Sequence, residues 1–225
     1  MNNKTSEVFN RNTLISPLAV NLSIHARKKM LNIFFSRFNP KKGMKILDIG
    51  VTSDSEEPSN YLEKTYPYLD DITCAGIQDC SELISMFPGI QFVQLIKDQP
   101  LPFVDKSFDV VYSNAVIEHV GSRKNQQDFI DEILRVGKNF FITTPNRWFP
   151  VEHHTHVPFL HFLPQKYFRK FLQYKGENFF SCEDNLNLCS IDDIKRFDFH
   201  ENEINIEKIK IYGFTSNLCI YNLAK

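Results

Sequence analysis

The feature of the sequence that most constrains the fold is a set of five short apolar segments between residues 44 and 146. More polar stretches connect each segment to the next. Each segment is almost continuously apolar, as expected of a strand covered on both faces of a parallel sheet; a strand with one wet face would alternate. Strands that alternate with helices are typical of a doubly wound α/β sheet. The expected strands are residues 44–50, 71–77, 90–96, 107–117 and 138–146.

Helical spacing and start signals indicate the elements around these strands. Ser16 and Pro17 are typical of a helix start, and apolar residues follow at helical spacing until the chain reaches Pro40. We therefore expect a long N-terminal helix, and shorter helices at 58–66, 81–87 and 125–137. Near the end, two apolar strands flank Gly213 and are expected to pair as a hairpin.

The composition argues against several classes of partner. The net charge is −1 and the lysines are scattered, so nucleic acid is not expected as a partner. The first residues are polar, and no apolar run approaches the roughly 20 residues that span a bilayer, so we expect a cytoplasmic protein without membrane association. Five cysteines without a CxxC pair or metal-ligand spacing are expected to be reduced structural thiols rather than metal ligands.

The loop after the first expected strand has an unusual composition for a nucleotide site. Asp48 and Gly50 begin it, but the other glycines of GxGxxG are missing, and acidic residues follow. Such a loop would repel phosphate, so NAD, FAD and ATP fit poorly and a nicotinamide oxidoreductase is disfavoured. S-adenosylmethionine carries an ammonium and a sulfonium and suits the loop better. The alternative is that the acids only cap the next helix.

Four segments carry a resemblance to a known family. The runs "ILDIG", "AGIQD", "LPFVDKSFDVVYSNAVIEHV" and "FFITTPNRWFP" occur in order between about residues 45 and 163. This pattern resembles the class I S-adenosylmethionine-dependent methyltransferases, of the small bacterial methyltransferase-domain type. The resemblance implies a Rossmann-like seven-stranded sheet with an antiparallel last strand. It also implies S-adenosylmethionine as cofactor and a small-molecule acceptor.

The resemblance divides the chain into four parts of one methyltransferase domain, residues 1–225. Residues 1–40 are expected to form an N-terminal helical cap and 44–145 the cofactor-binding core. Residues 146–180, rich in aromatics, prolines and histidines, are too long for a simple connection and are interpreted as an acceptor-side insertion after the fifth strand. Residues 181–225 supply the C-terminal strands.

The resemblance also implies the cofactor-binding residues. The family's ribose-binding acid falls on Gln78 and its adenine-binding acid on Lys97, so the neighbouring acids are candidates to replace them. If neither does, the chain would be a non-catalytic methyltransferase-fold binding or partner protein. The expected cofactor contacts are Asp48, Gly50, Val51, Gln78, Asp79, Lys97, Asp98, Ser113 and Asn114.

Histidines provide the candidates for chemistry on the acceptor. Methyl transfer mainly needs alignment, and a base is needed only if the acceptor loses a proton. His119 follows the fourth strand and is either that base or a packing residue. His153, His154 and His156 lie in the insertion and are the other candidates; HxxxH on a helix is absent, so no metal is expected. Expected acceptor contacts are Arg123, Asn146, Arg147 and Trp148.

The sequence therefore predicts methyl transfer to an oxygen or nitrogen of a small polar metabolite. Relatives with such an insertion suggest a sugar or surface-polysaccharide precursor as the acceptor. The acceptor itself and the oligomeric state are not encoded in any motif.

Overall fold

The computed structural model describes residues 17–54, 58–152, 154–155 and 157–223. Within them, a seven-stranded sheet has the order β3-β2-β1-β4-β5-β7-β6. Strands β1 to β5 pair in parallel, and β7 runs antiparallel to both of its neighbours, which confirms the predicted sheet. The strands are β1 (Ile46–Ile49), β2 (Ile72–Gly76), β3 (Gln91–Gln94), β4 (Phe108–Asn114), β5 (Gly137–Pro145), β6 (Asn205–Ile211) and β7 (Phe214–Tyr221).

The predicted hairpin at the end of the chain is confirmed. Strands β6 and β7 are joined by Tyr212 and Gly213, which both have positive φ angles, 49° and 84°. Two residues of that conformation form the tight turn whose twist matches a hairpin. Gly213 is therefore the residue that allows β7 to return beside β5.

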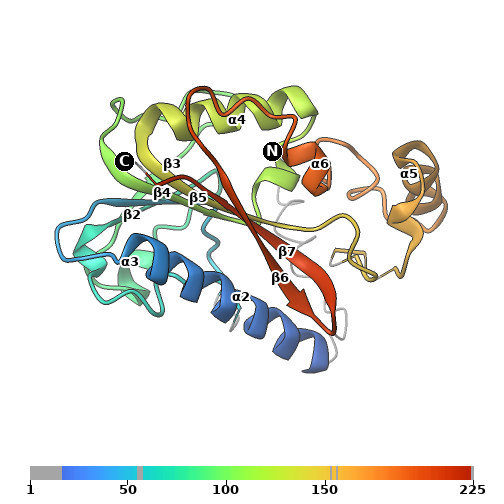
Figure 1. Cartoon of the computed structure of the whole chain (residues 1–225), viewed down its shortest axis with the longest axis horizontal. Coiled ribbons are helices and arrows are strands. Elements are labelled where there is room, and N and C mark those ends of the chain that lie inside the picture. The colour runs from blue at the N-terminus through green and yellow to red at the C-terminus, as the bar shows by residue number, and fades with distance from the viewer. Residues whose placement is uncertain (1–16, 55–57, 153, 156, 224–225) are drawn as a thin grey trace.

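The long helix α2 (Pro17–Phe38) covers one face of the sheet, together with the short α3 (Leu83–Met86), as Figure 1 shows. Phe34 of α2 is fully buried, and its ring makes edge contacts with Tyr112 of β4 and Phe141 of β5 at centroid distances of 5.2 and 5.5 Å. The predicted apolar face of this helix therefore packs on the centre of the sheet.

Helix α4 (Arg123–Val136) covers the opposite face. Ser122 caps its start by accepting a hydrogen bond from the backbone of Asn125, and Ile130 and Ile133 are buried against strand residues such as Val111. Successive residues of a strand therefore pack into two different hydrophobic cores, one under α2 and one under α4. This explains why the strands are continuously apolar.

The helix expected at residues 58–66 is not formed; the chain makes a series of turns there. Asn60 adopts a positive φ of 49°, and its side chain hydrogen-bonds the backbone N–H and C=O of Thr52 at 3.1 and 2.7 Å. Side-chain amides that bond the backbone compete with helix formation. Asn60 thus ties this segment to the loop after β1.

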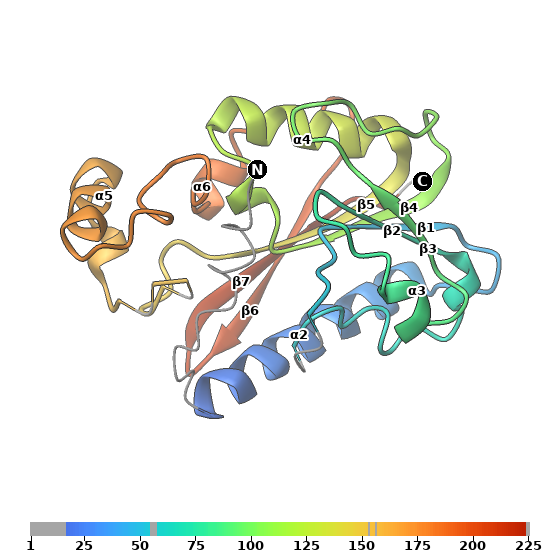
Figure 2. The ribbon, with the colours of Figure 1, turned by 180° about the vertical axis from the view of Figure 1, so that it is seen from behind.

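The segment after β5 leaves the sheet and contains η3 (Leu160–Phe162) and α5 (Gln165–Tyr174), which Figure 2 shows standing apart from the sheet. It returns through α6 (Ile191–Ile194), where Ser190 and Asp193 form a capping box. A backbone bridge between Asn146 and Cys189 closes its base. No helix in the described part of the chain has the length and apolarity to cross a membrane.

Truncation of Phe34 to alanine should test how α2 is held. The ring is fully buried among aromatic neighbours, so its loss should cost about 3–5 kcal/mol of unfolding free energy in denaturant titrations. Phe159, which is 59% exposed, is the matched control, and its alanine variant should change that free energy by less than about 0.5 kcal/mol. Equal losses in the two variants would contradict the packing described here.

Candidate functional site

A glycine contact brings the loops after β1 and β4 together. Gly50 has a φ of 100° and donates its N–H to Ala75 at 2.8 Å. A Cβ on Gly50 would overlap the Val116 side chain, so only glycine fits in both conformation and space. Val51 is buried directly after it. The predicted cofactor loop is therefore packed against the turn that carries Glu118 and His119.

Asp48 lies at the end of β1 with its side chain turned toward the α2 face, where it meets other charged groups. It is only 6% exposed and hydrogen-bonds the buried carboxyl of Glu63. Burial, and then the nearby Glu63, raise the pKa of Asp48 well above its ordinary value, while Arg27 of α2 opposes that shift. Asp48 thus contacts protein groups, and its predicted contact with a cofactor stays a prediction.

Sequence analysis missed Arg27 and Glu63. The guanidinium of Arg27 interacts electrostatically with four groups, namely Tyr112, Asp54, Glu118 and Asp48. Arg27 therefore lies near both the loop after β1 and the turn after β4. One signal existed, because Arg27 precedes the buried Phe34 by seven residues and therefore shares its helix face.

Beyond the ends of β2 and β3 lie the two positions at which the resembling family has acids, each followed by an acid in this chain. Gln78, Asp79, Lys97 and Asp98 are all exposed. One oxygen of Asp79 accepts the backbone N–H of Ser81 at 3.0 Å, and this hydrogen bond lowers the pKa of Asp79. Asp79 is thus a carboxylate at the ligand end of the sheet.

The two predicted residues at the end of β4 differ in surroundings. Ser113 is fully buried, and its hydroxyl has no hydrogen-bond partner among the described residues. Asn114 accepts a hydrogen bond from Thr143 of β5 at 2.6 Å through its side-chain oxygen. The Asn114 side chain therefore joins two neighbouring strands at the ligand end.

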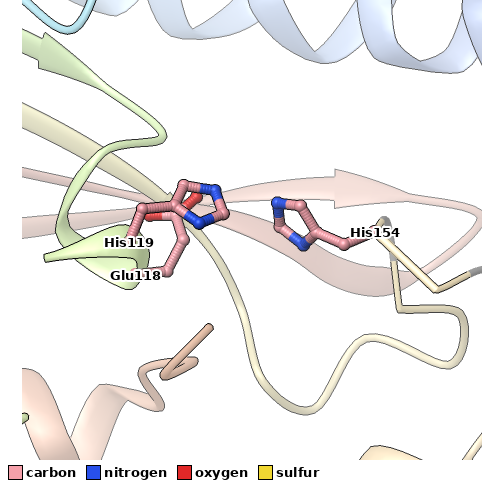
Figure 3. A group of neighbouring side chains, drawn as sticks. All are labelled: Glu118, His119 and His154. Carbon is pink, nitrogen blue, oxygen red and sulfur yellow. The ribbon is translucent and has the colours of Figure 1, made fainter. Parts of the chain in front are cut away.

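Glu118, His119 and His154 form one cluster, shown in Figure 3. The first two lie on η2 (Ile117–His119), directly after β4, and His154 comes from the loop after β5. The two imidazole rings meet edge to face with centroids 4.7 Å apart. One predicted histidine of the insertion therefore meets the predicted histidine after β4. His153 and His156 lie outside the described residues.

Hydrogen bonds fix the orientation of each member of this cluster. His119 Nδ1 is 2.7 Å from the Asn185 carbonyl, and His154 Nδ1 is 2.6 Å from Glu152 Oε1. Glu152 also accepts the backbone N–H of His154 and of Thr155. Glu118 accepts a hydrogen bond from Thr144 at 2.9 Å. The Nδ1 atom of each histidine thus has a hydrogen-bond partner within the protein, and Nε2 is the nitrogen of each ring that remains for other contacts.

Burial dominates the protonation of the cluster. It raises the pKa of Glu118 to about 7, although His154 opposes the shift, and it lowers the pKa of His119 to about 4. Burial also acts against the charged form of His154, but the adjacent Glu152 carboxylate outweighs it and raises that pKa. The cluster therefore places His119, whose pKa is lowered, beside Glu118 and His154, whose pKa values are raised.

The predicted acceptor residues are only partly gathered. Arg147 lines a cleft beside α5, and its guanidinium also lies 5.2 Å from the centre of the half-exposed Trp148 ring. Asn146 is buried and donates to the Thr215 carbonyl. Arg123 turns inward to Gln126, Cys189, Leu188 and Asp193. The cleft is lined by residues that include Arg147, His161, Gln165, Phe168, Arg169 and Phe180.

Comparison with known proteins supports the fold that carries this site. Residues 59–139 match the family model described as a methyltransferase domain. The chain has the fold of a class I S-adenosylmethionine-dependent methyltransferase. The match covers the strands β2 to β4 and α4, and it ends within β5, so it includes the turn that carries Glu118 and His119.

Solved methyltransferases share the fold across the whole chain at low sequence identity. A SAM-dependent methyltransferase from Aquifex aeolicus is 14% identical with a TM-score of 0.51, and 96% of each chain is covered. Magnesium protoporphyrin IX methyltransferase from Synechocystis PCC 6803, with bound SAH, is 11% identical with a TM-score of 0.58; the match covers 99% of this chain and 96% of that one.

A curated relative matches a shorter segment. Sarcosine/dimethylglycine N-methyltransferase from Aphanothece halophytica is 27% identical over 117 residues, which are 46% of this chain and 38% of the relative. The chain therefore matches well under half of that relative's length.

Replacement of Glu63 by glutamine should stabilise this methyltransferase fold more at high than at low pH. The raised pKa of Asp48 means that stability present below the ordinary carboxyl pKa is lost as the pH rises. Removing the neighbouring carboxylate lowers that cost, so the melting temperature should rise by about 2–4 °C at pH 8 and less at pH 4. Calorimetric scans would measure both.

The exposed Glu201 provides the control for that comparison. Its glutamine variant should have the same melting temperature as the unmodified protein at both pH values. A Glu63→Gln variant that lost stability equally at pH 4 and pH 8 would contradict the interpretation of the carboxyl pair.

Proposed function

We propose that this chain transfers a methyl group from S-adenosylmethionine to an oxygen or nitrogen of a small, anionic polar metabolite. The observation that carries the proposal is the contact between Gly50 and Val116, which joins the predicted cofactor loop to the Glu118, His119 and His154 cluster. The methyltransferase family model and fold support it. The predicted cofactor loop and groups able to take a proton are thereby adjacent, as methyl transfer needs when the acceptor loses a proton.

The residues at the ligand end of the sheet fit such a cofactor. It supplies an electrophilic methyl group on a sulfonium and carries an ammonium, so it favours nearby carboxylates, and because it has no phosphate it needs no phosphate-binding loop. The loop after β1 carries Asp54, and Asp79 stands exposed after β2. Gly76 allows close approach there, since a Cβ on it would lie 3.2 Å from the Val51 carbonyl. We assign Asp79 the ribose contact that Gln78 cannot make with two acceptor oxygens.

The cleft beside α5 supports an anionic acceptor. Two guanidinium groups, of Arg147 and Arg169, line it together with the amide of Gln165. Arginine is the residue best suited to bind carboxylate or phosphate oxygens. Phosphorylated sugars and polysaccharide precursors meet that requirement, and so do amino acids, such as the two named for the Aphanothece relative.

In the reaction, the S–CH₃ bond breaks as an O–CH₃ or N–CH₃ bond forms, and the acceptor releases its proton. We assign the release of that proton to the neighbourhood of His119 and His154, since the His154 ring is 5.4 Å from Phe180, which lines the cleft. The apolar ring of Phe180 limits access of water to the same place.

A second candidate function is a non-catalytic partner protein with the same fold. Gln78 and Lys97, which stand where the family has acids, favour it. Asp48, Gly50 and the intact turn from Val116 to His119 oppose it, because they match the family's cofactor loop and the turn after β4.

Cofactor binding separates the two functions. The purified protein should bind S-adenosylhomocysteine in calorimetry, and Asp79→Ala should weaken binding by about 10- to 100-fold, as expected for a lost charge-assisted hydrogen bond. Gln78→Glu should bring little gain. A large gain from Gln78→Glu with a silent Asp79→Ala would return the ribose contact to position 78, and no heat in the unmodified protein would favour the partner-protein alternative.

Turnover tests the histidine cluster. A screen of phosphorylated sugars and amino acids with labelled S-adenosylmethionine would identify the acceptor. His119→Ala and His154→Ala should then lower turnover by about 10²- to 10⁴-fold while leaving S-adenosylhomocysteine affinity within a few-fold. The exposed His200, near Asp131 and Asp198, is the matched control and should have no effect on either. Full turnover in both cluster variants would remove the cluster from the mechanism.

A further inference from the structure

Three potential metal ligands converge from two separate segments of the chain. Glu118 and His119 lie on η2 after β4, and His154 lies in the loop after β5. One ligand atom from each comes within 4.8 Å of the others, and Figure 3 shows the two imidazoles facing one another beside the carboxyl group. The sequence could not indicate this set, because its members are not spaced as a motif.

The buried carboxyl group of Glu118 has one oxygen atom that lacks a hydrogen-bond partner in the described part of the chain. Glu118 is fully buried, and only its Oε2 atom is hydrogen-bonded, to Thr144. The other oxygen, Oε1, has no hydrogen-bond partner among the described residues. A buried carboxyl oxygen without a partner is costly, and a cation at this position would remove that cost.

The histidines are oriented as metal ligands are. Nδ1 of His119 donates to the Asn185 carbonyl, and Nδ1 of His154 donates to Glu152. These bonds leave Nε2 of each ring as the nitrogen that can offer a lone pair to a metal. Histidines that bind metals almost always donate their other N–H to a carbonyl or a carboxylate in this way. Glu152 is itself 3% exposed and held by the backbone N–H of Thr155 at 2.6 Å.

We propose that Glu118, His119 and His154 bind one divalent transition-metal ion of the zinc type. Two imidazoles and one carboxylate form a ligand set used by catalytic zinc sites, which keep a fourth position open. Magnesium and calcium prefer all-oxygen sites and fit this set poorly. Zinc would draw the three ligand atoms from within 4.8 Å to about 3.4 Å of one another, a closure of at most about 1.4 Å.

The open position gives the metal a role that rests on the proposed function. An acceptor oxygen bound there would be polarised, so that its proton leaves more readily to solvent as the O–CH₃ bond forms and the S–CH₃ bond breaks. The site lies between the Gly50 loop and the arginine cleft, so one acceptor molecule could bind the metal with its hydroxyl and the cleft with its anionic group.

Titration with zinc sulfate tests the site directly. The 225-residue protein, freed of metal with a chelator, should bind one zinc ion per chain in calorimetry with a dissociation constant below about 10 µM. His154→Ala and His119→Ala should each weaken binding at least about 100-fold, and Glu152→Gln by about 10- to 100-fold, since it only orients His154. Magnesium chloride should give no comparable heat.

Control variants distinguish this site from other histidines. His200→Ala, and a double replacement of His153 and His156 by alanine, should leave the zinc affinity within a few-fold. Circular dichroism would check that each variant is folded, and His154→Ala, in the loop after β5 and outside the sheet, remains informative if His119→Ala is not folded. Loss of zinc binding in the double variant but not in His154→Ala would overturn the proposal, as would absence of zinc binding in the unmodified protein.

Separate titration of S-adenosylhomocysteine keeps the two proposals apart. Zinc binding without S-adenosylhomocysteine binding would support the metal site and contradict the proposed function. The reverse result would contradict the metal site and leave the proposed function standing.

Discussion

The contact between Gly50 and Val116 is the constraint on which the rest of the site depends. Only a residue without a side chain can turn the chain at the end of β1 and still allow Val116 to pack there. Because Val116 begins the turn after β4, this contact determines where Glu118 and His119 lie relative to the cofactor loop. The loop from β5 then adds His154, so three strand ends meet in one place.

Electrostatics shapes the same region. The carboxyl groups of Asp48, Glu63, Asp54 and Glu118 gather around the ends of β1 and β4, and Arg27 from α2 lies among them. Burial of Asp48, and then the nearby Glu63, raise the pKa of Asp48, so the ionised form of Asp48 costs stability here. Such a region is suited to a cationic ligand, and it would repel the phosphates of a dinucleotide.

Sequence analysis predicted the sheet well because its signals are local. The five apolar strands, the long helix after Pro17 and the hairpin at Gly213 each depend on residues close together in the chain, and each was confirmed. The helix expected at 58–66 was wrong, because the tertiary hydrogen bonds of Asn60 with Thr52 override its local pattern.

The site was less predictable, because its groups meet only through the fold. The sequence named His119 and His154 separately, and nothing in their spacing could show that their rings lie 4.7 Å apart. Arg27 and Glu63 were missed for the same reason, since a charged residue on a helix or a turn usually faces solvent. The acceptor contacts predicted for Arg123 and Asn146 were named from chain position, which carries no information about the partners that their side chains find within the protein.

The central claim is that a cofactor site and an acceptor site meet at the Gly50 and Val116 contact. A crystal structure of the protein with S-adenosylhomocysteine tests it most directly. Our account predicts the ligand at the carboxyl ends of β1, β2 and β4, with its ribose at Asp79 and its sulfur directed toward His119 and His154. Ligand bound at any other surface, or crystals that take up none at saturating concentration, would contradict it.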